Sequence, residues 1–534
     1  MSDQVGSTAP GAERAQLIEG DPARSTATAP DDGRLRGRIG VLELTLTVLA
    51  FSAPMVVVTG PTPFVIIFGG AGAPLAFVLA MAVLLLFTVG YTAMTRYLPN
   101  PGAFYAYITA GLGKIVGLGS SFLALFAYLA FGVSTYAFFA VVGQDLVETV
   151  LHGPAIPWYV YGLGGIAATG VLGYFRVDLS AKVLSVVMAC EVLLVGVFDG
   201  AVLWKGGADG PSLTPFTWHA LTSGSVGLAV LFAVMCFVGF EATAVFREET
   251  RDPQRTVPRA TYLSVVSIGV FYVVAAWCLI LAYGTDRARA VAESNFAGMF
   301  SSAAATYLGT WASDAVTALV VTSAFAAILA GQNILARYCH SLSVDRVLPP
   351  GLSKVHPRHG SPCTSSLTIT AVMAVALSIS ALSTSDITAA YSQLAGAAAF
   401  AVVVLMFLTN LSVVFFFKKN RDIADAPAWH RLIAPVLSGV GLGVVLWLSL
   451  ANFTTMTGGS MGTAIALQVV IWAVFLTGMA LAAVYRSRRP DVYARIGRQK
   501  AGGSGRPDDN GTTSSVKNPP SAVAFDGALG GRDV

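Results

Sequence analysis

The chain has 534 residues, of which 55% are hydrophobic and only 12% are charged, and its formal net charge is +4. A soluble domain carries about 25% charged residues. The composition therefore excludes an ordinary soluble protein and indicates an integral membrane protein.

Twelve apolar segments follow one another between two polar ends. Residues 1–38 and 487–534 are rich in Gly, Pro, Ser, Asp and Arg, so we expect disordered tails around a membrane domain at 39–486. Most of the twelve segments are close to the roughly 20 residues that a membrane-spanning helix needs. They cover residues 40–68, 73–95, 111–142, 157–174, 180–204, 222–246, 259–284, 312–338, 363–383, 387–417, 432–452 and 462–485. The prediction is an all-α integral membrane protein with about twelve transmembrane helices.

The positive charges are distributed unevenly between the two sides of these segments. If the N-terminus is cytoplasmic, only Lys205, Arg287 and Arg289 among the Lys and Arg residues lie in outer loops. Cytoplasmic loops of membrane proteins carry the excess of Lys and Arg. Both ends of the chain are therefore expected in the cytoplasm.

The first and sixth segments contain residues that interrupt a helix. The first reads "FSAPMVVVTGPTP" over residues 51–63, with Pro54 and Gly60 inside the apolar run, and the sixth carries Gly239 at its centre. Irregular backbone at membrane depth is tolerated only where it is buried or lines a cavity. Two interrupted helices at corresponding places in two halves indicate a transporter site. The halves would be segments one to five and six to ten.

Two carboxylates lie deep inside predicted membrane segments. Glu191 is near the middle of the fifth segment, and Glu241 follows the glycine of the sixth. An ionisable group at membrane depth is costly and is a functional candidate. Desolvation favours the protonated form of a carboxyl group, so Glu191 is a candidate proton carrier. The alternative for each is a structural carboxylate that only holds helices together.

Broken helices also offer backbone groups to a substrate. The N-terminus of a half-helix favours a carboxylate, and the free carbonyls at a half-helix C-terminus accept hydrogen bonds from an ammonium group. We expect these groups and the aromatic side chains beside them to bind the headgroup of a zwitterion, although ordinary packing is the alternative for each aromatic. The candidate substrate-binding residues are Ser52, Ala53, Pro54, Met55, Tyr128, Phe237, Val238, Gly239 and Phe240.

Four stretches of the chain together resemble the amino acid-polyamine-organocation (APC) superfamily of transporters. The resemblance covers nearly all of segments one to ten, and it depends on the four stretches occurring in this order. They are "NPGAFYAYITAGLGK" (100–114), "FVGFE" (237–241), "EETRDPQRTVPRA" (248–260) and "ARYCHSLSVDRVLPPGLSKVHPRHGSP" (336–362).

The resemblance implies a five-plus-five inverted repeat with broken first and sixth helices, alternating access, and uptake or exchange of amino acids or related amines. It places residues 237–240 at the unwound substrate segment and makes Glu241 similar to the residue that couples substrate occupancy to helix movement. The chain departs from the family where "SAPMVVVTG" (52–60) replaces a Gly-Ser-Gly-type run. It also carries Glu191 where some proton-coupled members have a lysine.

The first hypothesis is therefore a secondary active amino acid permease of the cell membrane, coupled to protons through Glu191 and Glu241. A transporter of polyamines or other organic cations, or an amino acid exchanger, is the nearest alternative. A sensor or channel is a less favoured class because the segments show no continuous polar pore face. No nucleophile and base pair, phosphate loop, metal-binding spacing or nucleic-acid motif occurs, so we expect no enzyme, cofactor, metal or nucleic-acid partner.

Overall fold

The computed structural model describes residues 39–98, 103–175, 179–356, 361–383, 387–420 and 427–497. The tail expected at 1–38 and most of the tail expected from 487 onward lie outside these ranges. The described residues belong to one unit that ends at Gln499.

The described chain is built from helices, and its β-structure is limited to one isolated bridge between Ile39 and Thr250. The first group of elements is α1 (Val41–Ser52), α2 (Pro54–Thr59), α3 (Pro61–Gly69), η1 (Gly70–Gly72), α4 (Ala73–Thr95), α5 (Ala103–Leu112), α6 (Lys114–Asp145), η2 (Leu146–Val150), α7 (Trp158–Phe175) and α8 (Leu179–Lys205). The middle group is η3 (Thr214–Phe216), α9 (Trp218–Thr222), α10 (Val226–Met235), η4 (Phe240–Ala244), η5 (Arg247–Glu249), α11 (Pro253–Tyr283), α12 (Ala288–Ser294), α13 (Met299–Leu308) and α14 (Thr310–Val344). The last group is η6 (Pro350–Ser353), α15 (Cys363–Ser383), α16 (Ile387–Lys419), η7 (Trp429–Ile433), α17 (Ala434–Ala451), α18 (Phe453–Thr457), α19 (Met461–Arg488) and α20 (Pro490–Arg495).

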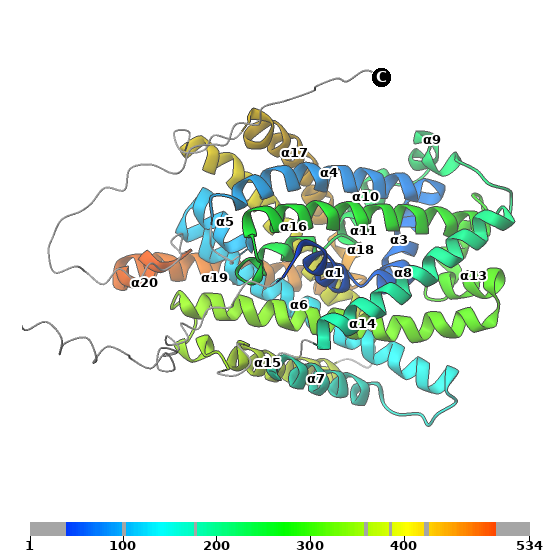
Figure 1. The fold of residues 1–534 in the computed structure, drawn as a ribbon, viewed down its shortest axis with the longest axis horizontal. Coiled ribbons are helices and arrows are strands. Elements are labelled where there is room, and N and C mark those ends of the chain that lie inside the picture. Colours follow the sequence, from blue (N-terminus) through cyan, green and yellow to red (C-terminus); the bar gives the residue numbers. More distant parts are fainter. Residues whose placement is uncertain are drawn as a thin grey trace, which may run out of the picture. The chain divides into compact units, whose positions relative to one another are not determined.

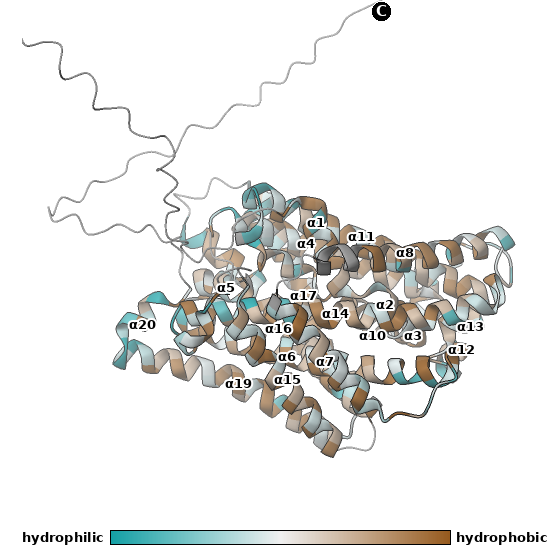
Figure 2. Cartoon of the chain, turned by 60° about the horizontal axis from the view of Figure 1, so that its bottom comes forward, coloured by the Kyte–Doolittle hydropathy of each residue, from teal (hydrophilic) through white to brown (hydrophobic). Residues whose placement is uncertain are grey.

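Within the described ranges, eleven helical stretches are long and apolar enough to cross a membrane. Figure 2 shows hydrophobic residues along most of the long helices and hydrophilic residues mainly at their ends and in loops. Helices satisfy their own backbone hydrogen bonds, which lipid cannot do. The predicted all-α membrane architecture is confirmed. The expected segment at 157–174 forms α7, but it is not among the eleven stretches.

The first predicted span is not one helix but three short ones. α1, α2 and α3 divide residues 41–69 at Ala53 and at Gly60. The first helix, α1, contacts α8, α11, α14 and η4, and in Figure 1 it lies near the centre of the bundle. The interruption therefore lies where several long helices meet.

Two of the stretches that resemble the transporter superfamily begin helices that pack into the bundle. The stretch before the third span forms α5, whose Phe104, Tyr105, Tyr107 and Ile108 are buried. The stretch at 248–260 already enters α11 at Pro253.

α20 lies within the segment expected as the C-terminal tail. Its backbone is held by α6, because Lys114 Nζ donates hydrogen bonds to the carbonyls of Tyr493 and Ala494. The backbone N–H of Gly497 donates to the hydroxyl of Tyr105. The chain therefore stays packed on the helical bundle as far as the end of the described residues.

Candidate functional site

The first helix break is centred on Ala53. This residue has φ 46° and ψ 69°, in the left-handed region, which is unusual for a residue other than glycine. Pro54 follows as the first residue of α2 and has no N–H, so the N–H of Met55 is the first donor at the start of this half-helix. The start of α2 therefore presents a backbone donor to the bundle interior.

The second helix break is centred on Gly239. Its φ of 118° is accessible to glycine and strained for other residues. The α-helix α10 ends at Met235, and the chain continues after the break only as the short 3-10 helix η4. Both interruptions predicted from the sequence are confirmed, and the second half of the sixth span is not α-helical.

Glu191 on α8 closes the first break. Its Oε2 atom accepts hydrogen bonds from the N–H of Met55 at 3.2 Å and from the hydroxyl of Ser323 on α14 at 2.9 Å. The side chain is 2% exposed. A carboxylate is favourable at a helix N-terminus because the helix dipole is positive there. Glu191 therefore joins α2, α8 and α14 at one point.

Glu241 closes the second break from within its own segment. Its carboxylate accepts hydrogen bonds from the N–H of Gly239 at 2.8 Å and from the hydroxyl of Tyr128 on α6 at 3.3 Å. The backbone carbonyl of Glu241 accepts a hydrogen bond from Tyr91 on α4 at 3.0 Å. The side chain is fully buried. A local turn thus satisfies the free backbone donor, and α4 and α6 hold it in place.

Phe51 connects the two breaks. A Cβ atom added at Gly239 would lie 2.6 Å from Cδ1 of Phe51, so the absence of a side chain at this glycine allows the close approach. The Phe51 ring also lies 6.5 Å from the ring of Tyr128, centroid to centroid. A second link joins Ser52 to Tyr272 on α11 through a 3.1 Å hydrogen bond between their hydroxyls. The two breaks are therefore packed against each other.

The predicted substrate-binding residues gather around this junction. All are buried except Val238, which is partly buried; the set is Ser52, Ala53, Pro54, Met55, Tyr128, Phe237, Val238, Gly239 and Phe240. Phe237 packs edge-on against Tyr272, whereas Phe240 packs edge-on against Phe87 on α4. The arrangement brings the two predicted segments together, and their substrate contacts remain predictions.

Three residues of the junction were not predicted from the sequence. Phe51 and Tyr272 have ordinary apolar and aromatic positions in their spans, so no local pattern distinguishes them. Ser323 is a polar residue in the apolar eighth predicted span and was a possible signal. Its partner Glu191 is 132 residues away in the sequence, and only the tertiary structure pairs them.

Comparison with known proteins places this geometry in a family. The sequence model described as "Amino acid permease" matches residues 43–475, which include both breaks and both carboxylates. The chain belongs to the amino acid permease family. The predicted resemblance to APC transporters is confirmed, and the permease is a multi-pass membrane transporter and not an enzyme.

Curated relatives of the permease differ in what their names say they transport. The low-affinity putrescine importer PlaP of Escherichia coli is 23% identical over 400 residues, which is 72% of this chain and 82% of PlaP. The branched-chain amino acid permease BcaP of Bacillus subtilis is 22% identical over 63% of this chain and 73% of its own. The glutamate/serine transporter AimA of Bacillus subtilis is 22% identical over 55% of this chain and 57% of its own.

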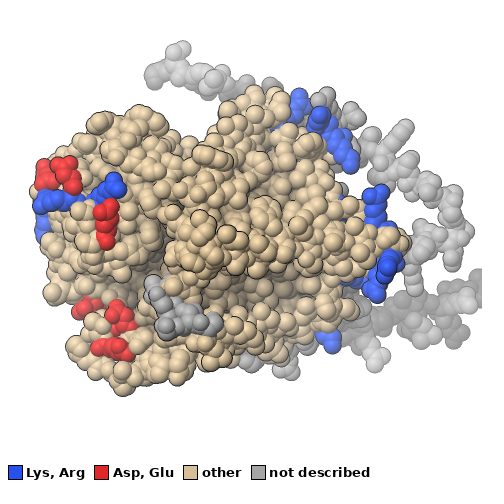
Figure 3. Space-filling view, turned by 180° about the vertical axis from the view of Figure 1, so that it is seen from behind, with Lys and Arg blue, Asp and Glu red and all other residues tan. Residues whose placement is uncertain are grey.

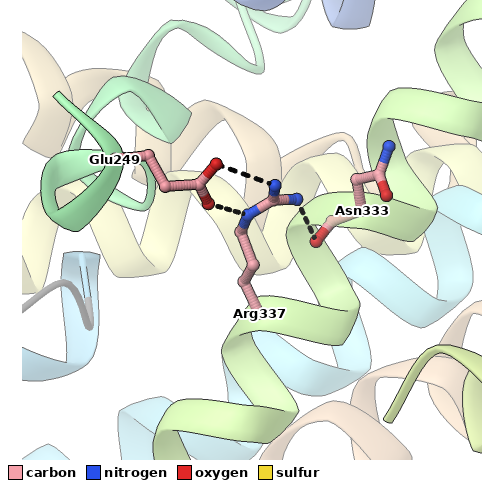
Figure 4. Close-up of polar contacts among 3 residues, drawn as sticks. All are labelled: Glu249, Asn333 and Arg337. Atoms are coloured by element: carbon pink, nitrogen blue, oxygen red, sulfur yellow. Dashed lines mark hydrogen bonds and ion pairs between the residues drawn. The ribbon is translucent and has the colours of Figure 1, made fainter. Parts of the chain in front are cut away.

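A buried ion pair lies beyond the second break of the permease (Figure 4). Arg337 on α14 binds both carboxylate oxygens of Glu249 on η5, and its Nη1 atom donates to the carbonyl of Asn333. The Arg337 guanidinium also lies 4.7 Å from the ring centroid of Phe246. The backbone carbonyl of Glu249 accepts a hydrogen bond from the N–H of Ile39, just before α1. This latch, Glu249 with Arg337, therefore ties the ends of the two broken spans to α14.

Proposed function

We propose that the permease is a secondary active transporter that moves amino acids across the cell membrane by alternating access, coupled to protons. The observation that carries the proposal is the packing of two helix breaks on each other, each with a buried carboxylate on its free backbone donor. Broken helices of this kind supply the binding groups of transporters built from inverted repeats. A five-plus-five repeat with the broken spans in corresponding positions is part of the proposal.

Glu191 is the proposed proton carrier. Its carboxyl group accepts hydrogen bonds from the N–H of Met55 and the hydroxyl of Ser323, and both bonds are strongest when the group is charged. Protonation removes the negative charge, and hydrogen bonds to charged groups are stronger than those to neutral groups. Proton binding therefore weakens the connection of α2 to α8 and α14, which links the charge of Glu191 to movement of the first break.

The latch is the proposed gate on one side of the site. Side chains of the latch pair are largely buried, 16% exposed for Arg337 and 4% for Glu249. Breaking a buried pair leaves two desolvated charges, so opening of the protein at this end requires water to reach both. The contact of Glu249 with Ile39 means that opening also releases the start of α1.

The latch end is the proposed cytoplasmic side. In Figure 3 one end of the visible surface carries Lys and Arg without Asp or Glu, whereas the other end carries Asp and Glu together with some Lys and Arg. The positive-inside rule assigns the basic end to the cytoplasm. Under this orientation both ends of the chain are cytoplasmic.

A second candidate function is transport of an amine that lacks a carboxylate, such as a diamine. One observation favours it: the N–H of Met55, which could bind a substrate carboxylate, already binds Glu191. The two buried carboxylates would then attract the ammonium groups of the substrate. PlaP is named as a putrescine importer, which gives this candidate a precedent among the relatives. Exchange of one amino acid for another is a further variant of the first candidate.

Uptake by the purified permease in liposomes tests both candidates. Labelled neutral, acidic and basic amino acids and putrescine are offered with and without an inward proton gradient. Accumulation of an amino acid only with the gradient supports the proposal. Selective uptake of putrescine supports the second candidate. Uptake of amino acids that ignores the proton gradient but requires a counter-substrate inside contradicts proton coupling and indicates an exchanger.

A further inference from the structure

A second candidate site lies outside the junction of the breaks, where α4, α11 and η7 meet. A cavity of about 210 Å³ occupies this place, and we call it the basic groove. The residues that line the groove include Arg96 and Tyr97 at the end of α4, Tyr262 on α11 and His430 on η7. One water molecule takes up about 30 Å³ in the liquid, so the groove has room for a larger polar group.

Two nitrogen-bearing side chains of the groove have polar atoms to offer a ligand. Arg96 is exposed, and no carboxylate within the described ranges forms an ion pair with it. The Nδ1 atom of His430 is shielded from solvent and has no hydrogen-bond partner among the residues that the structure describes. A buried polar atom without a partner is destabilising. An anion in the groove would supply the missing acceptor for both residues.

The surroundings of the groove are basic. Lys418 and Lys419 end α16, whose Phe417 packs edge-on against Tyr97 with ring centroids 5.8 Å apart. Arg259 lies one turn before Tyr262, and Arg431 follows His430. Asp252 is the one acidic residue among four described stretches around the groove, and its carboxylate lies 3.7 Å from the Arg255 guanidinium. These stretches are 92–98, 252–262, 414–420 and 427–433. Among these described stretches the charge balance therefore favours a negatively charged ligand.

Exposed apolar side chains continue from the groove along the helices that line it. Trp429, Leu432 and Ile433 on η7 are about half exposed, and Leu263 and Val266 on α11 are exposed to a similar degree. In a membrane protein such surfaces face acyl chains, and tryptophan is enriched at the level of the headgroups. A free phosphate ion would not contact these apolar surfaces, whereas a phospholipid would contact both them and the basic residues.

We propose that the basic groove binds the phosphate headgroup of an anionic phospholipid. Arg96 and His430 donate hydrogen bonds to the phosphate oxygens, Tyr262 forms part of the groove wall, and the acyl chains lie along η7 and α11. Basic pockets between transmembrane helices bind anionic headgroups elsewhere in this way. The site is separate from the junction of the breaks and does not depend on the substrate of the permease.

Native mass spectrometry of the purified protein tests the site. The protein is mixed with equal amounts of phosphatidylglycerol and phosphatidylcholine, and the bound lipid is measured for the parent, Arg96→Gln and Arg96→Lys. We expect the parent protein to retain phosphatidylglycerol. In Arg96→Gln the affinity for phosphatidylglycerol should fall about fivefold, because one basic residue near an anionic lipid contributes a binding free energy of that size. Arg96→Lys should retain part of the affinity. Arg96 is exposed, and an unchanged melting temperature shows that the variant is folded.

Arg488→Gln is the matched control, because it removes one exposed positive charge at the end of α19 and does not line the groove. Equal losses in Arg96→Gln and Arg488→Gln would mean that net charge alone attracts the lipid, which overturns the site. Equal retention of both lipids by the parent also overturns it. In the last measurement, soluble glycerol phosphate competes with the bound lipid. Displacement of the lipid by an equimolar amount of glycerol phosphate would identify a free phosphate ester as the ligand and would refute the proposal of a lipid site.

Discussion

The two helix breaks differ in where the group that closes each of them comes from. The break at Ala53 is closed by Glu191, which is 136 residues from its backbone partner Met55. The break at Gly239 is closed by Glu241, two residues along the chain. The first break is therefore held by tertiary structure, and the second is largely encoded in a short local sequence.

This difference has a mechanical consequence. Any movement of α8 or α14 relative to α2 changes the hydrogen bonds of Glu191. The hydrogen bond between Glu241 and Gly239 can persist while the whole segment moves, because both partners move together. The first break is suited to sense the positions of other helices, and the second is suited to act as a rigid hinge.

Gly239→Ala is expected to have the largest effect. A left-handed backbone costs a residue with a Cβ about 1–3 kcal/mol, and here the added Cβ would lie 2.6 Å from the ring of Phe51. We expect uptake in liposomes to fall by about a hundredfold, since each 1.4 kcal/mol is a factor of ten. Initial uptake rates, normalised to the amount of reconstituted protein, measure the effect.

Ala53→Gly is the matched control on the other break. Ala53 already has φ 46°, so glycine relieves about 1–3 kcal/mol of left-handed strain there, and the added freedom of the unfolded chain offsets about 0.4–1 kcal/mol of that gain. We expect near-parental uptake. A large loss from Ala53→Gly together with a mild effect of Gly239→Ala would reverse the assignment of the rigid hinge.

Glu241→Gln comes next in size. The amide keeps one acceptor oxygen, but its NH2 group must face either the N–H of Gly239 or the hydroxyl of Tyr128. Loss of a charged hydrogen bond costs about 1.5–3 kcal/mol, which predicts a decrease in uptake of at least about tenfold. Cell-surface labelling must show normal amounts of the variant in the membrane. Unchanged uptake would refute the coupling role of Glu241.

The sequence predicted the second break more completely than the first. Gly239 and Glu241 are neighbours, so a local pattern contains both the break and its closing group. At the first break the sequence indicated Pro54 and Gly60, yet the left-handed residue is Ala53, whose identity gives no signal. The pairing of Glu191 with Met55 and Ser323 could not be predicted, because it depends on how distant helices pack.

Other contacts of the site also depend on how distant helices pack. Tyr128 donates a hydrogen bond to Glu241, a contact that no local pattern indicated, and its predicted contact with substrate remains a prediction. The latch joins η5 to α14 across 88 residues. Its charges are visible in the sequence, but nothing local shows that Glu249 and Arg337 meet. The positions of the spans and of the helix breaks can be predicted from local composition, whereas the contacts between spans become visible only in the folded structure.

Glu191→Gln should separate two activities of the permease. The neutral side chain keeps an acceptor oxygen for Met55 and Ser323 and resembles the protonated carboxyl group, but it cannot carry a proton. We expect loss of accumulation driven by a pH gradient, about tenfold or more, with exchange at equal pH largely retained. Uptake is measured with and without the gradient, and counterflow is measured with substrate inside. The same pH dependence in the variant and the parent would reject Glu191 as the proton carrier.

The smallest expected effects come from the side-chain donors to the two carboxylates. Ser323→Ala removes a 2.9 Å hydrogen bond to Glu191, and Tyr128→Phe removes a 3.3 Å hydrogen bond to Glu241. A hydrogen bond contributes about 1 kcal/mol, so we expect about a fivefold loss of gradient-driven uptake for Ser323→Ala and a smaller loss for Tyr128→Phe, whose bond is longer.

A double-mutant cycle shows whether Ser323 acts through Glu191. If it does, Ser323→Ala has a smaller effect in a protein that already carries Glu191→Gln, because the bond to the neutral amide is weaker than the bond to the carboxylate and the two changes are not additive. Additive losses would mean that Ser323 acts elsewhere, for example on substrate. The corresponding cycle of Tyr128→Phe with Glu241→Gln applies the same criterion to the second break. A strong coupling at the first break and a weaker one at the second is the result expected if the second break depends mainly on its local hydrogen bond between Gly239 and Glu241.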